Sequence, residues 1–302
     1  MKRKLSSFLI MIMMMSILIG CEKTVSKVQN EKGEEVLTQI SIMQKKNSKP
    51  KEIFGYLNQN IKELNKKAAS EAVGILVNTM EEYETIYNEQ LFTGTIPDLM
   101  YKYFEYVFDY SKIEFIKEAE LKELLYDITL GGFKIVDTEG TFMVIVDYNA
   151  LMTFNEYIED DLKYYIELLA MIYNDPAAMD ASIAVSSLEL EKRIIQMENY
   201  IKTYENQQRK EMILSLYLGY TMVYISGTEN TPIFDYDTGV MNAGMFKTFE
   251  AAAGTYNETI FGNVISKYIE VLKQEGFEST EKVQDFIINI DITVNDEISK
   301  LK

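Results

Sequence analysis

Histidine and tryptophan are absent from this chain of 302 residues, and cysteine occurs only once. Without histidine, no imidazole can act as the base of a serine, cysteine or metal-bound-water mechanism, and the most common metal ligand is missing. A single cysteine cannot form a disulfide within the chain. The sequence therefore predicts a fold stabilised by its core alone.

Glycine-rich nucleotide-binding motifs are also missing. The sequence contains no GxGxxG, no Walker phosphate-binding loop and no HExxH, so nucleotide cradles and zincin chemistry have no recognisable support. With 15 glycines and 4 prolines, the chain lacks the strand-rich, glycine-rich texture of two-lobed solute-binding proteins, whose doubly wound lobes need many parallel strands.

The first twenty residues have the organisation of an export signal. Lys2, Arg3 and Lys4 precede an apolar run that ends at Ile19 and is followed by Gly20. This is a charged region, an apolar region and a small-residue cleavage position. The run is about 15 residues long, shorter than the roughly 20 that a membrane-spanning helix needs. We expect a cleaved signal rather than a permanent anchor.

The sequence Leu18-Ile19-Gly20-Cys21 resembles the lipobox of bacterial lipoproteins. The resemblance covers residues 1–21 and implies that the thiol of Cys21 receives a diacylglyceryl group, that the signal is cut after Gly20, and that the lipidated Cys21 becomes the first residue. Two acyl chains bind a membrane stably, whereas one gives marginal binding. The resemblance thus implies an exported protein held on the outer face of the bacterial cytoplasmic membrane, or on a periplasmic membrane face.

The chain is strongly acidic, with a formal charge of −17 that becomes −20 when the three positive charges of residues 1–20 are removed. Such a surface disfavours nucleic acid and anionic headgroups. We expect a basic, neutral or cationic partner, namely a protein or a cell-wall polymer. An acidic surface also simply promotes solubility. Residues 21–50 are polar apart from a short apolar patch, and we interpret them as a lipidated tether.

Apolar residues recur every three or four positions through most of the remaining chain, which indicates a mainly α fold, either a helical bundle or an array of helical hairpins. One stripe predicts a single long helix; it comprises Leu57, Ile61, Leu64, Ala68, Ala72, Leu76, Met80, Tyr83, Tyr87 and Leu91. Pro97 suits the first turn of the next helix. Gly131 and Gly132 predict the end of a third helix.

One segment, residues 133–148, has β-branched and aromatic residues on both sides of a turn that ends at Gly140, and it predicts one small β-hairpin packed on helices. Asn149 is then the expected N-cap of a helix that runs to about Ile172. The stretch 174–185 predicts a boundary. The expected organisation is a signal peptide (1–20), a tether (21–50), a helical domain with the hairpin (51–175) and a helical-hairpin domain (176–302).

The second half shows an internal echo. Ser186 and Glu189 form a capping box that opens a helix. The order helix, "TYEN" or "TYNE", helix, glycine then occurs twice, ending at Gly227 and at Gly276. This order resembles the helical hairpins of tetratricopeptide-like lipoproteins, although the spacing of 52 residues departs from their usual 34. Two unrelated helical hairpins fit the pattern equally well. We expect the tail after residue 280 to be helical.

Carboxylates are the remaining candidates for chemistry. Glu156 and Asp160 are spaced to share a helix face, where such a pair could bind a cation or act on a glycosidic bond. Asp235 and Asp237 lie two apart before Gly239, as at the start of a calcium loop, but the closing glutamate is missing. We therefore interpret the first pair as a solvated helix face and the second as a turn, and expect no cofactor beyond the lipid on Cys21.

Tyrosine is abundant, with 21 copies and a cluster at positions 101, 103, 106 and 110. Such rings suit protein contacts and carbohydrate stacking, and equally the edge of a core. Three functional classes remain open. We expect a non-catalytic interaction or scaffold module rather than an enzyme. The alternatives are a ligand- or peptide-binding subunit of an uptake or sensing system, and a carboxylate-based cell-wall glycosidase.

Overall fold

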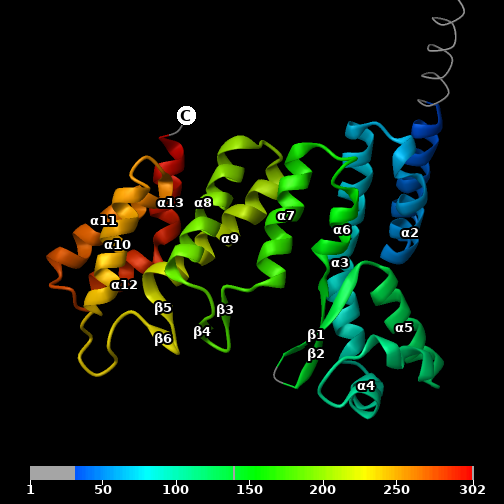
Figure 1. The fold of residues 1–302 in the computed structure, drawn as a ribbon, viewed down its shortest axis with the longest axis horizontal. Helices are drawn as coiled ribbons and strands as arrows, with labels where there is room; N and C mark the ends of the chain where they lie inside the picture. Colours follow the sequence, from blue (N-terminus) through cyan, green and yellow to red (C-terminus); the bar gives the residue numbers. More distant parts are fainter. Residues whose placement is uncertain (1–30, 139, 301–302) are drawn as a thin grey trace, which may run out of the picture. The chain divides into compact units, whose positions relative to one another are not determined.

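The computed structural model describes residues 31–138 and 140–300, and within them the chain is mainly helical (Figure 1). Three small antiparallel sheets, each of two strands, are the β-structure of these residues. The predicted fold class is confirmed. The chain divides into two compact units after Ile166, inside a helix and somewhat before the boundary expected at residue 175.

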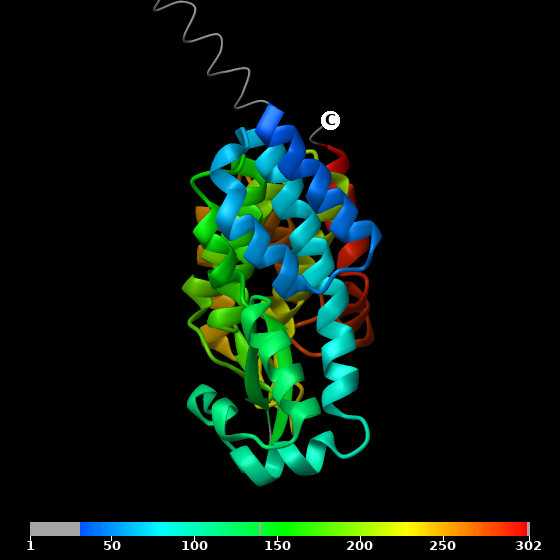
Figure 2. The ribbon, with the colours of Figure 1, turned by 90° about the vertical axis from the view of Figure 1, so that its right-hand side faces the viewer.

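Unit 1 begins with three helices, and the first of them changes our interpretation of the tether. Residues 31–45 are helical, with Val36 and Ile40 buried. A Cβ on Gly33 would lie 3.0 Å from the backbone oxygen of Glu63, so the two backbones approach closely. Residues 31–50 therefore belong to the folded unit and not to a flexible tether. Figure 2 shows this helix in blue, beside α2 (Pro50–Asn60) and α3 (Lys66–Leu91).

The long helix predicted from Leu57 to Leu91 is broken. α2 ends at Asn60 and a single 3₁₀ turn follows, before Asn65 adopts an extended conformation. The Asn65 side chain accepts a hydrogen bond from the backbone N–H of Ala68 and so caps α3. Both helices bury their apolar faces in the same core, so the apolar spacing continues through the break. Periodicity alone therefore did not reveal the break.

In the middle of unit 1, the helices begin and end close to the predicted positions. α4 (Ile96–Phe104) has proline in its first turn, as predicted, and ends at Glu105. A 3₁₀ helix (Tyr110–Phe115) leads to α5 (Ala119–Leu130). α5 is closed by Gly131, and Gly132 has a φ of +85°.

The predicted hairpin is confirmed. β1 (Phe133–Thr138) pairs with β2 (Thr141–Val146), Thr138 opposite Thr141, and Gly140 in the connection has a φ of +79°. A two-stranded hairpin needs a partner to be stable, and here β2 packs on α3.

The helix expected after Asn149 is interrupted. α6 spans Tyr148–Leu151, a 3₁₀ turn follows, and α7 (Asp160–Asn174) is a separate helix. The N-cap of α6 is Asp147, whose side chain accepts from the N–H of Asn149. Phe154 and Ile158 lie within the interruption, between Leu151 and Asp160, and both are buried. The apolar spacing therefore continues through a segment that is not α-helical.

Unit 2 consists of two successive helical hairpins and a helical tail. Ser186 caps α8 by accepting from the N–H of Glu189, as predicted, and Gly227 and Gly276 have φ values of +72° and +66°. The predicted order of helix, turn, helix and glycine is therefore present twice, and the tail is helical with a break at Asn289. The elements are β3 (Ala178–Met179), β4 (Ser182–Ile183), α8 (Ser187–Thr203), α9 (Gln207–Ser226), β5 (Gly227–Thr228), β6 (Thr231–Pro232), α10 (Ala243–Thr255), α11 (Ile260–Gln274), α12 (Glu281–Ile288) and α13 (Ile290–Ser299).

Candidate functional site

Two surface cavities lie near the C-terminal end of α3. On one side of the connection between α3 and α4 lies a groove of about 240 Å³. We call it the aromatic groove; it is lined by Phe92, Pro97, Met100, Tyr101, Glu105 and Phe142, among others. On the other side lies a larger polar pocket of about 560 Å³. Both are formed entirely by residues of unit 1, so the geometry of each is set within one folded unit.

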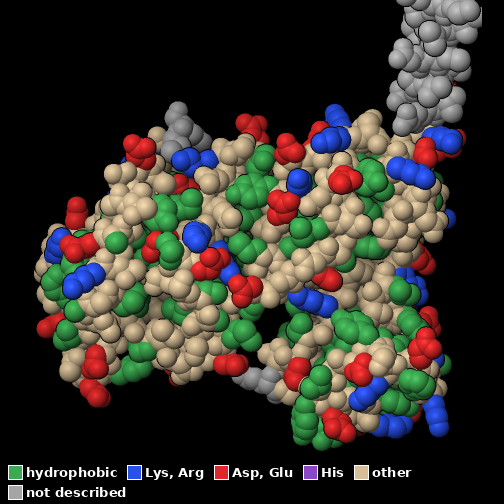
Figure 3. All heavy atoms as spheres, in the orientation of Figure 1, with side chains coloured by type: hydrophobic (Ala, Val, Ile, Leu, Met, Phe, Trp, Pro, Cys, Tyr) green, Lys and Arg blue, Asp and Glu red, His purple; other side chains and the backbone are tan. Residues whose placement is uncertain are grey.

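Aromatic side chains continue from the groove across the surface of unit 1. Phe92 and Tyr101 are just over half exposed, Tyr106 is 59% exposed and Phe115 is 76% exposed. Figure 3 shows hydrophobic side chains at the surface of this part of unit 1. Single exposed apolar residues are ordinary, whereas several large exposed rings in one part of the chain make a candidate contact surface.

Two of the tyrosines form a fixed pair. The ring centres of Tyr101 and Tyr106 are 5.5 Å apart in an edge-to-face arrangement, and their hydroxyls lie 3.3 Å apart. The Tyr106 ring also lies against Gly140 of the hairpin, since a Cβ there would be 3.9 Å from it. Contact with a packed neighbour lowers the conformational freedom of an exposed ring, so a ligand would need to immobilise these two rings less.

Glu105 stands at the end of α4 in an unusual backbone conformation. Its φ is +56° and its ψ −98°, and its N–H donates to the carbonyl of Tyr101. A residue other than glycine seldom adopts such a φ, and strain of this kind is concentrated at functional positions. The hydrogen bond with Tyr106 is the main cause that raises the pKa of Tyr101, and the charge of Glu105 makes the smallest contribution. Glu105 and Tyr101 both line the aromatic groove.

The outer edge of β2 contributes backbone groups to the same groove. Farther along this edge, the Asn88 side chain donates to the carbonyl of Val144 and accepts from its N–H, both at 2.8 Å, and Glu84 accepts from the N–H of Val146. In an antiparallel pair, outward-facing backbone groups recur at every second residue. The N–H and C=O of Phe142 therefore face outward on this edge, at the aromatic groove.

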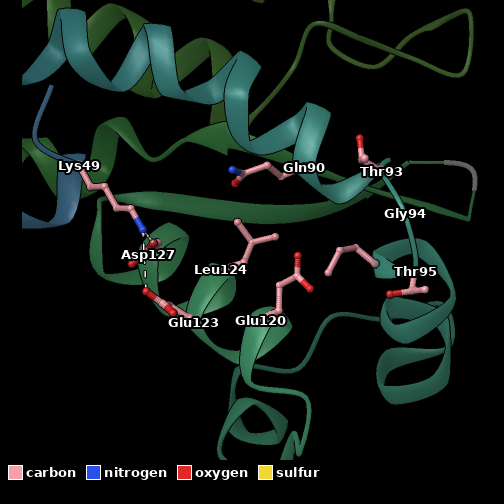
Figure 4. Close-up of a pocket in the computed structure, with 10 residues that line it drawn as sticks. Lys49, Gln90, Thr93, Gly94, Thr95, Glu120, Glu123, Leu124 and Asp127 are labelled. Carbon is pink, nitrogen blue, oxygen red and sulfur yellow. Dashed lines mark hydrogen bonds and ion pairs between the residues drawn. The ribbon is translucent and has the colours of Figure 1, made fainter.

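The polar pocket is lined by three carboxylates of α5, and it is already occupied by the protein's own charges (Figure 4). Figure 4 shows Lys49 pointing between Asp127 and Glu123, with Glu120 and Gln90 farther along the pocket. The nitrogen of Lys49 lies 4.0 Å from an oxygen of Glu123. Asp127 is buried and forms ion pairs with both Lys49 and Lys51.

These ion pairs hold unit 1 together. The hydrogen bond to Asp127 raises the pKa of Lys49 against the opposing effect of burial. A buried carboxylate is tolerated because it is paired, and its position beside the N-terminus of α2 adds to this stabilisation. We interpret the lysine–aspartate cluster as a structural clamp between α2 and α5 rather than as an acid and base for catalysis.

Unit 2 contains one further hollow of note, an apolar pocket of about 360 Å³ beside α9 that includes Gly219 and Tyr220. In the same unit, the side chain of Arg193 is buried and forms ion pairs with Asp175 and Glu189. This network joins the start of the β3–β4 hairpin to α8 and fills a structural role.

The carboxylate candidates Asp235 and Asp237 lie together in a hydrogen-bonded turn. Asp235 accepts from the N–H groups of Asp237 and Thr238, at 3.1 and 2.9 Å, and from the hydroxyl of Thr238. It forms the turn that we preferred over a calcium loop, and these bonds lower its pKa, with the backbone of Thr238 contributing most.

Glu156 and Asp160 do not share a helix. Glu156 lies in the turn before α7, and Asp160 is the first residue of α7. The expectation that they sit on one helix face is wrong, because that helix is interrupted. In residues 31–138 and 140–300, no group of three or more histidine, cysteine, aspartate or glutamate side chains is arranged to hold a metal ion.

The lipobox, Leu18, Ile19, Gly20 and Cys21, lies outside the residues that the structure describes. Among the helices of the described part, none combines the length and apolar character required to cross a bilayer. The lipid-attachment site stays a prediction from the sequence.

The sequence singled out the tyrosine cluster but not the site around it. Tyr101, Tyr106 and Tyr110 are exposed while Tyr103 is half-buried, so composition predicted the rings without their orientation. The backbone of Glu105 and the outward edge at Phe142 left no signal in the sequence. Comparison with known proteins gives no match to a family model, to a curated protein or to a solved structure.

Proposed function

We propose that this chain is a lipid-anchored, non-catalytic interaction module of the bacterial envelope, and that the aromatic groove with its neighbouring exposed rings is its contact surface. The single observation that carries the proposal is the group of large exposed side chains in unit 1, comprising Phe92, Tyr101, Tyr106, Val107, Tyr110 and Phe115. Aromatic rings of this kind are enriched at protein interfaces and depleted from ordinary surfaces.

The anchor and the surface support each other. A diacylated Cys21 would hold the chain at the membrane face, which makes any partner available at high effective concentration. Moderate affinity at a small aromatic surface is then sufficient. The absence of histidine from the sequence and the pairing of Asp127 with two lysines favour binding over catalysis.

Photo-crosslinking in cells tests the proposal. A photoreactive amino acid at Tyr106 should give a discrete protein adduct, and the same residue at Tyr236, which is 73% exposed in unit 2, serves as the matched control. A Tyr101→Ala substitution should weaken the Tyr106 adduct. Equal crosslinking from both positions would contradict a contact surface at the aromatic groove.

The alternatives predict other outcomes. A glycosidase would release sugars from purified wall material, and release that is lost on a carboxylate substitution in the polar pocket, such as Glu120→Gln, would contradict the non-catalytic proposal. Co-sedimentation of the chain with wall material, lost on Tyr101→Ala, would identify a wall polymer instead of a protein as the partner.

A further inference from the structure

We propose that the aromatic groove binds an extended polypeptide segment and receives a lysine side chain of that segment between the Tyr101–Tyr106 pair and Glu105. The inference rests on the proposed function, because it names the chemistry of the partner that the same surface would contact.

The charge of the groove favours a cation. Tyr101 and Glu105 both line the groove, and the Tyr106 ring packs edge-to-face on Tyr101. Among the described residues, none forms an ion pair with Glu105. An ammonium group gains from both components, since aromatic faces attract cations and the carboxylate supplies the opposite charge. The net charge of −17 would assist the approach of a basic partner.

The protein's own neighbouring lysine is engaged elsewhere. The Lys102 nitrogen lies 4.8 Å from the centre of the Tyr103 ring and 2.7 Å from a carboxylate oxygen of Glu118. The ammonium group of Lys102 is therefore bound by an aromatic ring together with a glutamate. Tyr101 and Glu105 offer the same two groups in the groove, and there the ammonium group would come from the bound peptide.

The edge of β2 favours a polypeptide over a free amine. Phe142 presents one outward N–H and one outward C=O at the groove, whereas the corresponding groups of Val144 are bonded to Asn88. An extended peptide that added to this edge would satisfy the Phe142 groups, and its side chains would alternate between the two sides. One of them could then reach Glu105 while the backbone stays paired.

The backbone conformation of Glu105 supports a role for its side chain. Glycine would adopt the φ of +56° without strain, yet the position carries a glutamate. Strain at an exposed residue is expected where the side chain has a task. In this groove the side chain supplies the negative charge.

Positional-scanning peptide libraries test the inference. The full chain, purified in detergent, is titrated into fluorescently labelled hexapeptide mixtures whose third residue is fixed as lysine, norleucine or glutamate, and binding is followed by fluorescence anisotropy. We expect the lysine mixture to bind about tenfold more tightly than the norleucine mixture, as is typical of a cation–π contact joined by one ion pair. The glutamate mixture should bind most weakly.

Two variants locate the effect. Glu105→Gln should reduce the preference for lysine over norleucine, because the rings alone then attract the ammonium group, and should leave norleucine binding unchanged. Tyr101→Ala should weaken the binding of both mixtures. Tyr236→Ala is the control and should change neither.

Each other outcome overturns the inference. Equal binding of the lysine and norleucine mixtures would refute the ammonium site; if Tyr101→Ala still weakened both, the proposed contact surface would stand. A lysine preference that is undiminished in Glu105→Gln would place the site elsewhere. The absence of peptide binding, with the Tyr106 crosslink retained, would exclude an extended polypeptide but not the interaction module.

Discussion

The carboxylate of Glu198 on α8 accepts a hydrogen bond from the backbone N–H of Phe261 on α11, at 2.9 Å. A second oxygen accepts from the N–H of Ile260 at 3.0 Å, and Lys202 lies 3.6 Å away. These N–H groups belong to the first turn of α11 and have no partner within that helix. One buried side chain thus joins the first helical hairpin of unit 2 to the second.

Replacing Glu198 with alanine should therefore destabilise unit 2 strongly. Two buried N–H groups would lose their acceptor, which costs on the order of 2–4 kcal/mol. We expect a clearly lower urea midpoint by circular dichroism, and hydrogen exchange should increase first at Ile260 and Phe261. Glu205→Ala, an exposed position after α8, is the control. Equal midpoints for the two variants would show that the capping bonds contribute little.

Glu118 provides a test of pH dependence. Hydrogen bonds from Lys102 (2.7 Å) and from the Tyr103 hydroxyl (2.5 Å) lower the pKa of Glu118 to about 2. A carboxyl whose pKa is lowered on folding stabilises the fold above its ordinary pKa, and this contribution is lost as the pH falls toward the folded value. Glu118→Gln should lower the melting temperature at pH 6 but much less at pH 2.5.

The matched control for Glu118 is Glu114→Gln, which replaces an exposed glutamate of the preceding 3₁₀ helix. It should change the melting temperature little at either pH. A difference between Glu118→Gln and wild type that stays constant from pH 6 to pH 2.5 would mean that the charge of Glu118 is not the cause.

Glu105 predicts a trade-off between stability and binding. Glu105→Gly should raise the melting temperature of unit 1, because glycine adopts the positive φ without strain; the gain is about 1 kcal/mol, or a few degrees. The same variant removes the carboxylate and should show a smaller preference for lysine peptides. Glu105→Ala is the control, since it loses the carboxylate but keeps the strain. Equal melting temperatures for the two variants would show that the backbone at Glu105 is unstrained.

Gly33 tests whether the helix over residues 31–45 is docked. Its Cβ position lies 3.0 Å from the backbone oxygen of Glu63, which a side chain cannot easily displace. Gly33→Val should therefore separate the two segments and lower the melting temperature. Gly55→Ala in α2, where the Cβ position has no neighbour within 4 Å, should instead raise stability by about 0.5–1 kcal/mol. A Gly33→Val chain as stable as wild type would restore the interpretation of this segment as a tether.

Cys21 tests the anchor itself. Cys21→Ser should leave the protein without lipid, since a serine hydroxyl does not replace the thiolate as a nucleophile for thioether formation. Growth with a tagged fatty acid, followed by isolation of the protein, measures the label directly. Equal labelling of the wild type and the variant would contradict the lipobox and the proposed localisation together.

The sequence predicted those elements whose determinants are local. Gly140 allowed the hairpin turn, the Ser186–Glu189 capping box opened α8, and Pro97 opened α4, because each depends on a few neighbouring residues. It did not predict the breaks at Asn65 and after Phe154. At both places the apolar spacing continues on either side of the interruption, so the hydrophobic pattern and the backbone disagree.

The candidate site was predictable only as a composition. The four tyrosines at positions 101, 103, 106 and 110 suited either a contact surface or the edge of a core. Which of them are exposed depends on how the short helix α4 packs on the hairpin, and this involves residues about 35 positions apart. The outward edge at Phe142 follows from the register of β1 and β2. Both relationships join residues that are too far apart in the sequence for a local apolar pattern to reveal them.

The pair of hydrogen bonds between Asn88 and Val144 has a consequence for the aggregation of the protein. An open strand edge is a template on which further chains can stack into fibres. The Asn88 amide offers its oxygen and an N–H group to Val144, so Asn88 imitates the backbone of a missing third strand and ends the sheet there. Growth of the hairpin into an aggregate is thereby blocked at its centre, while a segment a few residues long can still add at the tip.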